Sequence, residues 1–305
     1  MKKVARDQIL KIFCNNQNIQ IDFVMENLRI LISEAYAPLL LFAEDLDSPN
    51  FISRNNPFDG FFINMLHRST NVFGGIAILI ASGHLQEAET LSRSLTESSL
   101  KMMHLCKGNV PSNIAQYLAS YFSESSWEIS KWQKAVSSYN NHPHNKLIQD
   151  KNSIEDESKK ICRIFIEKAG YQWPEKTQSI TIEKLFKDLG KELEYRTVYR
   201  AMCGQPHQNP EDIVNGFLTA LSNNDELEHK HMEEKHCFSL FICLWGVRYY
   251  LESIATLAKL FSFQSVYVQT TRASEIVIEL QTNVSNGLKE CQLPTGWVKN
   301  TVDSV

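Results

Sequence analysis

An arginine and a histidine stand with six residues between them in the stretch YRAMCGQPHQNPED, at Arg200 and His207. A histidine that titrates near neutral pH can take a proton from a ribose 2′-hydroxyl group or return one to a leaving oxygen. An arginine can stabilise the negative charge that grows on the phosphate. The pair therefore has the chemistry for RNA cleavage without a metal ion, and a homodimer would supply both an acid and a base across its two-fold axis.

The same two residues also have a structural interpretation. Gly204 and Pro206 predict a loop between two helices, with Arg200 as a cation at the end of the first helix and His207 beside the start of the second. Such a spacing arises often by chance, so both interpretations stay open. A thiol nucleophile at Cys203 is a weaker alternative, because nothing in the sequence identifies a third group that would orient it.

Arg93 and Glu97 form a second pair, four residues apart on a strongly amphipathic segment. They lie opposite its apolar stripe, so we expect a solvated face on which the two side chains contribute little to stability. In the functional alternative this face lines a cleft and meets Tyr199, Arg200 and His207, where Glu97 would orient an arginine or a histidine.

A third cluster, His229, Glu233 and His236, falls on one face of a predicted helix and contains the Glu-x-x-His spacing of carboxylate-bridged metal sites. Such a site needs matching glutamates and a second copy of that spacing on partner helices, and we find no convincing one, so a solvated charged face is the expectation and a metal site the weak alternative. Walker, GxGxxG, GxSxG and HExxH motifs are also missing, and we expect no cofactor.

Two stretches carry a resemblance to known families: GHLQEAETLSRSLTESSLKMMHL (83–105) and YRTVYRAMCGQPHQNP (195–210). Together they resemble an uncharacterised bacterial all-helical family, a domain of unknown function, over roughly residues 60–260. The arginine-to-histidine spacing also resembles the HEPN superfamily, whose small helical bundles often dimerise and cut RNA. The chain departs from that pattern at Ala201, where HEPN proteins often have a polar residue, and in the loop that separates Arg200 from His207.

The HEPN resemblance implies a metal-independent ribonuclease or an RNA-binding effector in bacterial antiphage or toxin-type defence. It further implies RNA and a second copy of the chain as partners, with a protein partner encoded nearby. Arg200 and His207 would be catalytic, and Arg93, Glu97 and Tyr199 would support them. The competing class is a non-enzymatic helical interaction or scaffold protein, in which the same Arg, Glu and His residues are structural.

Scarce proline and glycine and frequent helical periodicity predict an all-α fold, a multi-helix bundle of roughly seven to ten helices with a HEPN-like core. The expected helices cover 21–46, 61–82, 84–108, 113–139, 146–170 with a solvated first half, 182–202, a helix that begins at Pro210, 226–263, and a last one near 273–290 after a short extended piece, SVYVQTT (265–271). We expect a single domain, 1–305, with an N-terminal helical segment (1–57), a core bundle (60–263) and a C-terminal tail and helix (264–305).

Bulk composition excludes several classes of protein. The net charge of −4 argues against a protein that coats nucleic acid with its whole surface, so any RNA site must be a local basic patch. The seven cysteines contain no CxxC pair and indicate reduced thiols in a cytoplasmic protein. The apolar stretches 72–83 and 237–251 are shorter than a membrane span, and we expect neither a membrane segment nor a signal peptide.

Overall fold

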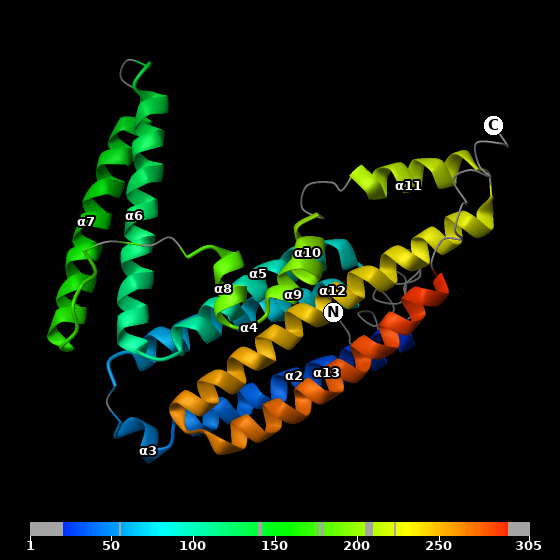
Figure 1. The fold of residues 1–305 in the computed structure, drawn as a ribbon, viewed down its shortest axis with the longest axis horizontal. Coiled ribbons are helices and arrows are strands. Elements are labelled where there is room, and N and C mark those ends of the chain that lie inside the picture. Colours follow the sequence, from blue (N-terminus) through cyan, green and yellow to red (C-terminus); the bar gives the residue numbers. More distant parts are fainter. Residues whose placement is uncertain are drawn as a thin grey trace, which may run out of the picture. The chain divides into compact units, whose positions relative to one another are not determined.

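The computed structural model describes residues 21–54, 56–139, 142–175, 177, 180–204, 210–222 and 224–291. Within these ranges every regular element is a helix and no strand occurs (Figure 1). The prediction of an all-α, multi-helix fold is therefore confirmed. The chain divides into two compact units: residues 1–55, 60–103 and 191–305 form the first, and residues 56–59 and 104–190 form the second. The predicted division into an N-terminal helical segment, a core bundle and a C-terminal tail and helix stays a prediction.

Three long helices run side by side in the first unit, namely α2 (Ile21–Leu46), α12 (Asp225–Phe261) and α13 (Gln264–Cys291) (Figure 1). The part of α12 from Ser239 onward is mostly buried, in agreement with the prediction that this helix is central. Ser262, with a φ of 63°, ends α12 in the left-handed conformation and turns the chain into α13.

The predicted extended piece at residues 265–271 is wrong, because this stretch is the first part of α13. Val266, Thr270, Ala273 and Val277 are fully buried, and their spacing is that of one helix face. Two of the four β-branched residues of the stretch, Val266 and Thr270, are therefore buried by tertiary packing in a helical conformation, which outweighs their intrinsic preference, whereas Val268 and Thr271 are exposed.

Two further helices of this unit, α4 (Asp59–Ala81) and α5 (Leu85–Leu105), are joined at Gly83, whose φ is 78°. A β-carbon at Gly246 of α12 would lie 3.1 Å from the Cα atom of Ser92 on α5. The ring of Phe73 on α4 stacks on the ring of Tyr250 of α12, with ring centroids 5.4 Å apart. The contact at Gly246 shows that α5 and α12 cross with their backbones close together.

The predicted continuous helix over 182–202 is also wrong. Gly190, with a φ of 74°, separates α8 (Ile182–Asp188) from α9 (Glu192–Glu194). A π-helical segment, Tyr195–Tyr199, follows and leads into α10 (Arg200–Gly204). The apolar periodicity of this stretch is helical throughout, but it does not reveal a left-handed glycine or a local change of helix type.

The next helix, α11 (Pro210–Leu221), begins at the proline that was predicted to start it. By length and composition α12 alone among the described helices could cross a membrane. Within this helix, 61% of the most apolar 18-residue window is buried inside the protein. The core helix of a soluble protein can have the same length and composition.

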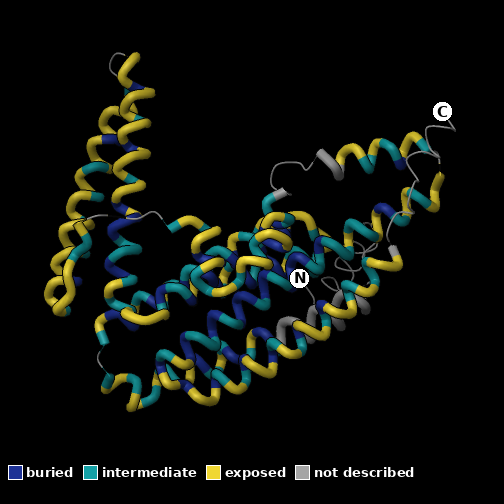
Figure 2. Tube along the Cα trace, viewed as in Figure 1, coloured by how far each residue is buried: buried dark blue, intermediate teal, exposed yellow. Residues whose placement is uncertain are grey.

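The second unit is built on the long helices α6 (Val110–Val136) and α7 (His144–Lys168), which pack against each other. The side chain of Asn109 caps α6 by accepting a hydrogen bond from the backbone N–H of Ser112. Ile129, Val136 and Ile148 form the small apolar core between the two helices. Figure 2 shows that most of α7 is exposed, as expected for the first half of the predicted helix 146–170.

Candidate functional site

Arg93 and Glu97 lie on α5, where their i and i+4 positions place both side chains on one face of the helix. The Nε atom of Arg93 donates to Oε1 of Glu97 over 2.9 Å. The two side chains are only 30% and 26% exposed. The pair is thus more buried than the solvated face that the sequence favours.

The neighbouring polar residues of α5 explain this burial. Ser92, Thr96 and Ser99 are all 0% exposed, although they are polar. Ser92 donates its hydroxyl hydrogen to the carbonyl oxygen of Ala88, which satisfies the hydroxyl within the helix. Thr96 instead donates to the sulfur of Met202, 106 residues further along the chain, so this polar side of α5 is packed against another element.

Tyr199 joins the pair from the π-helical segment, 102 residues further along the chain. Its hydroxyl group donates to Oε1 of Glu97 over 2.7 Å, so one carboxylate oxygen accepts from both Arg93 and Tyr199. The guanidinium carbon of Arg93 lies 5.8 Å from the centre of the Tyr199 ring. Arg93, Glu97 and Tyr199 therefore form a connected polar network, called here the Arg93–Glu97–Tyr199 network.

Burial and hydrogen bonding perturb the titration of two members of this network. Burial raises the pKa of Tyr199 well above its ordinary value, and the hydrogen bond to Glu97 raises it further. For Arg93, burial is the largest single effect and would lower the pKa, but the hydrogen bond to Glu97 and the interactions with Tyr199 and Cys203 together outweigh it, and the pKa is raised. At neutral pH the network consequently combines a neutral phenol with a charged guanidinium.

A second carboxylate holds the start of the same short segment. Lys191 donates to Glu252 of α12 over 2.8 Å, and Arg248 lies 3.4 Å from the same carboxylate. The Lys191 ammonium group also lies 5.4 Å from the centre of the Tyr249 ring. Residues 191–199 are therefore fixed at both ends, by Glu252 on α12 and by Glu97 on α5.

The π-helical segment also changes the direction in which Arg200 points. Successive residues of an α-helix turn by about 100°, so residues five apart point about 140° away from each other. A π-helix bonds residue i to residue i+5, and residues four and five apart both lie one turn from the first. Accordingly the Tyr195 and Tyr199 rings stack, with ring centroids 5.6 Å apart. The guanidinium carbon of Arg200 lies 5.8 Å from the centre of the Tyr195 ring.

Arg200 is exposed at the surface of α10. His207 lies outside the described residues, so the predicted Arg200–His207 pair is not placed by the structure. Of the five predicted site residues, the structure brings together Arg93, Glu97 and Tyr199, and it places Arg200 one residue after Tyr199.

The metal alternative finds no support in the arrangement of its residues. His229 and Glu233 lie 3.4 Å apart on α12 as an exposed pair, and His236 is exposed as well. Among the described residues, no group of three His, Cys, Asp or Glu side chains could hold a metal ion. His229, Glu233 and His236 thus form a solvated charged face of α12.

Sequence reasoning missed three residues beside the network. Glu89 is a carboxylate with 0% exposure on α5, one turn before Arg93. The signal was present in the sequence, because Glu89, Arg93 and Glu97 follow one another at intervals of four residues. Tyr195 of the π-helical segment was missed because only the change of helix type brings it beside Arg200, whereas the spacing of four residues between Arg196 and Arg200 was already visible in the sequence.

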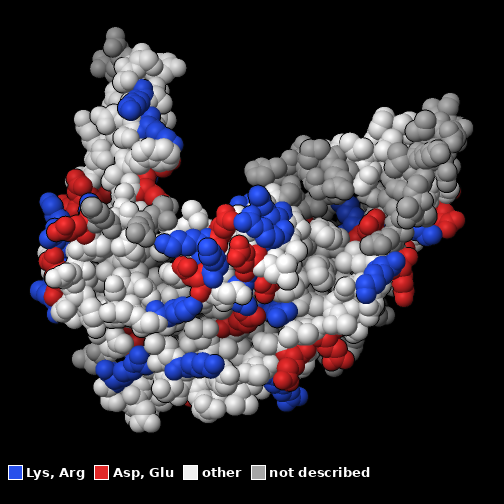
Figure 3. Space-filling view, viewed as in Figure 1, with Lys and Arg blue, Asp and Glu red and all other residues white. Residues whose placement is uncertain are grey.

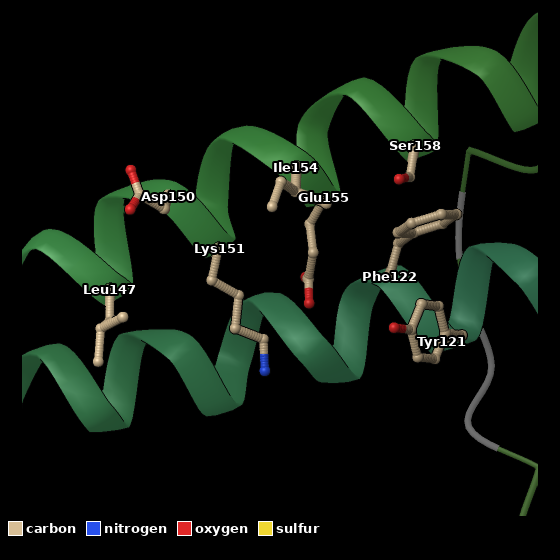
Figure 4. A pocket seen from close by; sticks show the side chains of 8 residues that line it. All are labelled: Tyr121, Phe122, Leu147, Asp150, Lys151, Ile154, Glu155 and Ser158. Atoms are coloured by element: carbon tan, nitrogen blue, oxygen red, sulfur yellow. The ribbon is translucent and has the colours of Figure 1, made fainter. Parts of the chain in front are cut away.

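A separate apolar groove lies between α6 and α7 in the second unit, with a volume of about 460 Å³ (Figure 4). Tyr121 and Phe122 line it from α6, and Leu147 and Ile154 line it from α7. Glu155 points toward α6, where Ser125 donates a hydrogen bond to it (Figure 4). Asp150, Lys151 and Ser158 complete its lining, and all three belong to α7.

Comparisons of the chain with curated proteins and with solved structures found no match. A family model matches residues 59–227, which is more than half of the chain. The matched range includes α5, the π-helical segment and the whole Arg93–Glu97–Tyr199 network. It confirms the expected resemblance to a family without known function. The chain belongs to DUF5677, a family of unknown function.

Proposed function

We propose that the protein is a HEPN-like, metal-independent ribonuclease or RNA-binding effector that acts as a homodimer, in bacterial antiphage or toxin-type defence. The observation that carries the proposal is the position of Arg200. It is an exposed arginine that directly follows a segment anchored to two helices, through Glu97 and Glu252. An arginine on a fixed turn is suited to contact a phosphate group, since less conformational freedom is lost on binding.

In the proposed reaction, His207 removes the proton from a ribose 2′-hydroxyl group. The 2′-oxygen then forms a bond to phosphorus, and the bond from phosphorus to the 5′-oxygen breaks. The His207 of a second copy donates a proton to that 5′-oxygen, which leaves a 2′,3′-cyclic phosphate and a 5′-hydroxyl end. Arg200 stabilises the additional negative charge on the phosphoryl oxygens during this step.

The test is cleavage of RNA by the purified full chain in the presence of a chelator. We expect Arg200→Ala and His207→Ala each to lower the rate by at least about 100-fold with the melting temperature nearly unchanged, since each removes one catalytic group. Arg163→Ala is the matched control, because Arg163 is an exposed arginine of α7. The proposal fails if the wild-type chain does not cleave RNA, if cleavage requires a divalent metal ion, or if both variants cleave normally.

The second candidate function is a non-enzymatic helical interaction protein, and the network itself favours it. Arg93 and Tyr199 both donate to Glu97, so these three groups satisfy one another within the chain, as in a structural network. Exposed apolar side chains along α7, including Leu147, Ile154 and Ile161, are typical of protein-interaction surfaces. Under this function Arg93→Ala and Glu97→Ala lower the melting temperature, and the wild-type chain leaves RNA intact under all conditions.

A further inference from the structure

We infer that Tyr195, Arg196 and Arg200 form a platform that binds single-stranded RNA in preference to duplex RNA. The inference rests on the proposed function, because it assigns the form of the substrate at the same site. It also assigns a binding role to two residues, Tyr195 and Arg196, that the arginine and histidine spacing does not include.

The first observation is the arrangement of rings and guanidinium groups on the π-helical segment. The Tyr195 and Tyr199 rings are stacked with an interplanar angle of 18°, and Tyr199 is only 5% exposed. Tyr195 is half-buried, so part of its ring remains at the surface. Tyr199 therefore supports Tyr195 from the interior, where the hydrogen bond to Glu97 holds it in place.

The second observation is that the guanidinium groups of two exposed arginines both lie near the Tyr195 ring. The guanidinium carbon of Arg196 lies 5.2 Å from the centre of the Tyr195 ring, and that of Arg200 lies 5.8 Å from it. Figure 3 shows Lys and Arg side chains gathered over the segment that contains α10, with Asp and Glu side chains directly beside them. A local basic patch of this kind is what the net charge of −4 requires of a nucleic-acid site.

Together these groups match the needs of an unpaired strand. Bases of single-stranded RNA stack on tyrosine rings and on the flat face of a guanidinium group, and both are present here. The arginines can also bind phosphate oxygens of the backbone. A duplex keeps its bases stacked inside, and could use only the phosphate contacts of this platform.

The test measures binding by fluorescence anisotropy with the full chain and a 2′-O-methylated RNA of about 15 nucleotides. Methylation blocks the 2′-oxygen, so the probe cannot be cleaved by the proposed reaction. We expect the single strand to bind at least about 10-fold more tightly than a duplex of the same sequence, which corresponds to the stacking of one or two bases. Equal affinity for the single strand and the duplex overturns the inference.

Three variants assign the contacts. Tyr195→Leu should weaken single-strand binding about 10-fold with little effect on the duplex, whereas Tyr195→Phe should keep the affinity because it keeps the ring. Arg196→Gln should reduce the salt dependence of binding by the equivalent of about one phosphate contact, a change of about 0.7 in the logarithmic slope. Tyr139→Leu is the control, because Tyr139 is an exposed tyrosine of the second unit.

The outcomes separate this inference from the proposed function. If Tyr195→Leu binds the single strand like wild type while Arg200→Ala and His207→Ala lose cleavage, the platform is wrong and the catalytic proposal stands. If Tyr195→Leu loses single-strand binding but the wild-type chain never cleaves RNA, the platform stands and the catalytic proposal is wrong. If Tyr195→Leu melts well below wild type, the Tyr195→Phe and Arg196→Gln variants decide, and normal binding by Arg196→Gln contradicts the platform.

Discussion

Two Arg-x-x-x-Glu pairs of this protein have the same spacing and almost the same contact, but different surroundings. The Nε to Oε1 distance is 2.9 Å for Arg93–Glu97 on α5 and 2.8 Å for Arg163–Glu167 on α7. The side chains of the first pair are 30% and 26% exposed, and those of the second are 61% and 45% exposed. Helical spacing thus accounts for both contacts, whereas the burial of the first pair comes from elements distant in the sequence.

A third partner is what distinguishes the buried pair. Glu97 accepts a second hydrogen bond from Tyr199, and no such third group appears in the contacts described for Arg163 and Glu167. The Arg248–Glu252 pair follows the same rule as Arg93–Glu97, because Lys191 is its third partner. Both third partners come from residues 191–199, so the buried pairs also position this segment.

The largest effect on stability is expected from a substitution that separates α5 from α12. Gly246→Ala would place a β-carbon 3.1 Å from the Cα and carbonyl oxygen atoms of Ser92, and one of the two helices would have to shift. We expect a loss of about 1–3 kcal/mol in the free energy of unfolding, as in other overpacked sites. Urea denaturation measures it. Gly74→Ala in α4 is the control, since its β-carbon would meet nothing within 4 Å, and an equal loss there would contradict this account.

Removing the third partner should have the next largest effect. Tyr199→Phe keeps the ring but removes the hydroxyl group that donates to Glu97. Because Glu97 is part-buried and keeps its bond to Arg93, we expect a loss of about 1 kcal/mol. Chemical denaturation of Tyr199→Phe beside Tyr139→Phe, at an exposed tyrosine, measures the difference. A loss of the same size in both variants would show that the bond to Glu97 contributes nothing.

Double-mutant cycles compare the two pairs directly. We expect a coupling energy of about 1 kcal/mol between Arg93 and Glu97, and of less than about 0.5 kcal/mol between Arg163 and Glu167, because solvent screens the more exposed pair. The four single alanine variants and the two double variants provide the measurement. If Tyr199→Phe is introduced first, the coupling at Arg93 and Glu97 should change while that at Arg163 and Glu167 does not. Equal coupling energies in the two pairs would show that Tyr199, the third partner, does not strengthen the Arg93–Glu97 interaction.

Alkaline titration gives the smallest and most specific effect. Burial and the bond to Glu97 raise the pKa of Tyr199 above its ordinary value of 10.0, so folding favours the neutral phenol. The stabilisation is fully present below about pH 10 and is lost as the pH rises above it, because the unfolded chain then ionises more readily. Tyr199→Phe should therefore lose less stability between about pH 9 and pH 11 than wild type does. An unchanged slope would mean that Tyr199 titrates normally.

The sequence predicted long helices well and short ones poorly. The boundaries of α2, α4, α5 and α12 agree with the expected ranges to within about three residues, because each helix has many apolar positions at regular spacing. The break of 182–202 at Gly190 and the π-helical segment were not predictable, since a single glycine and one extra residue per turn hardly alter that pattern. The extended piece predicted at 265–271 is wrong because the strand preference of its β-branched residues does not take account of the packing of α13 against α12.

For the site, the sequence determined that Arg93 and Glu97 share a helix face and that Arg200 lies near a helix break. Only the tertiary structure decided that Tyr199 meets Glu97 across 102 residues, whereas a local π-helical turn that the sequence pattern did not reveal brings Tyr195 beside Arg200. Spacing along one helix fixes local contacts because the helix geometry is constant. Which face becomes buried depends on how other elements pack against it, as the contrast between Arg93–Glu97 and Arg163–Glu167 demonstrates.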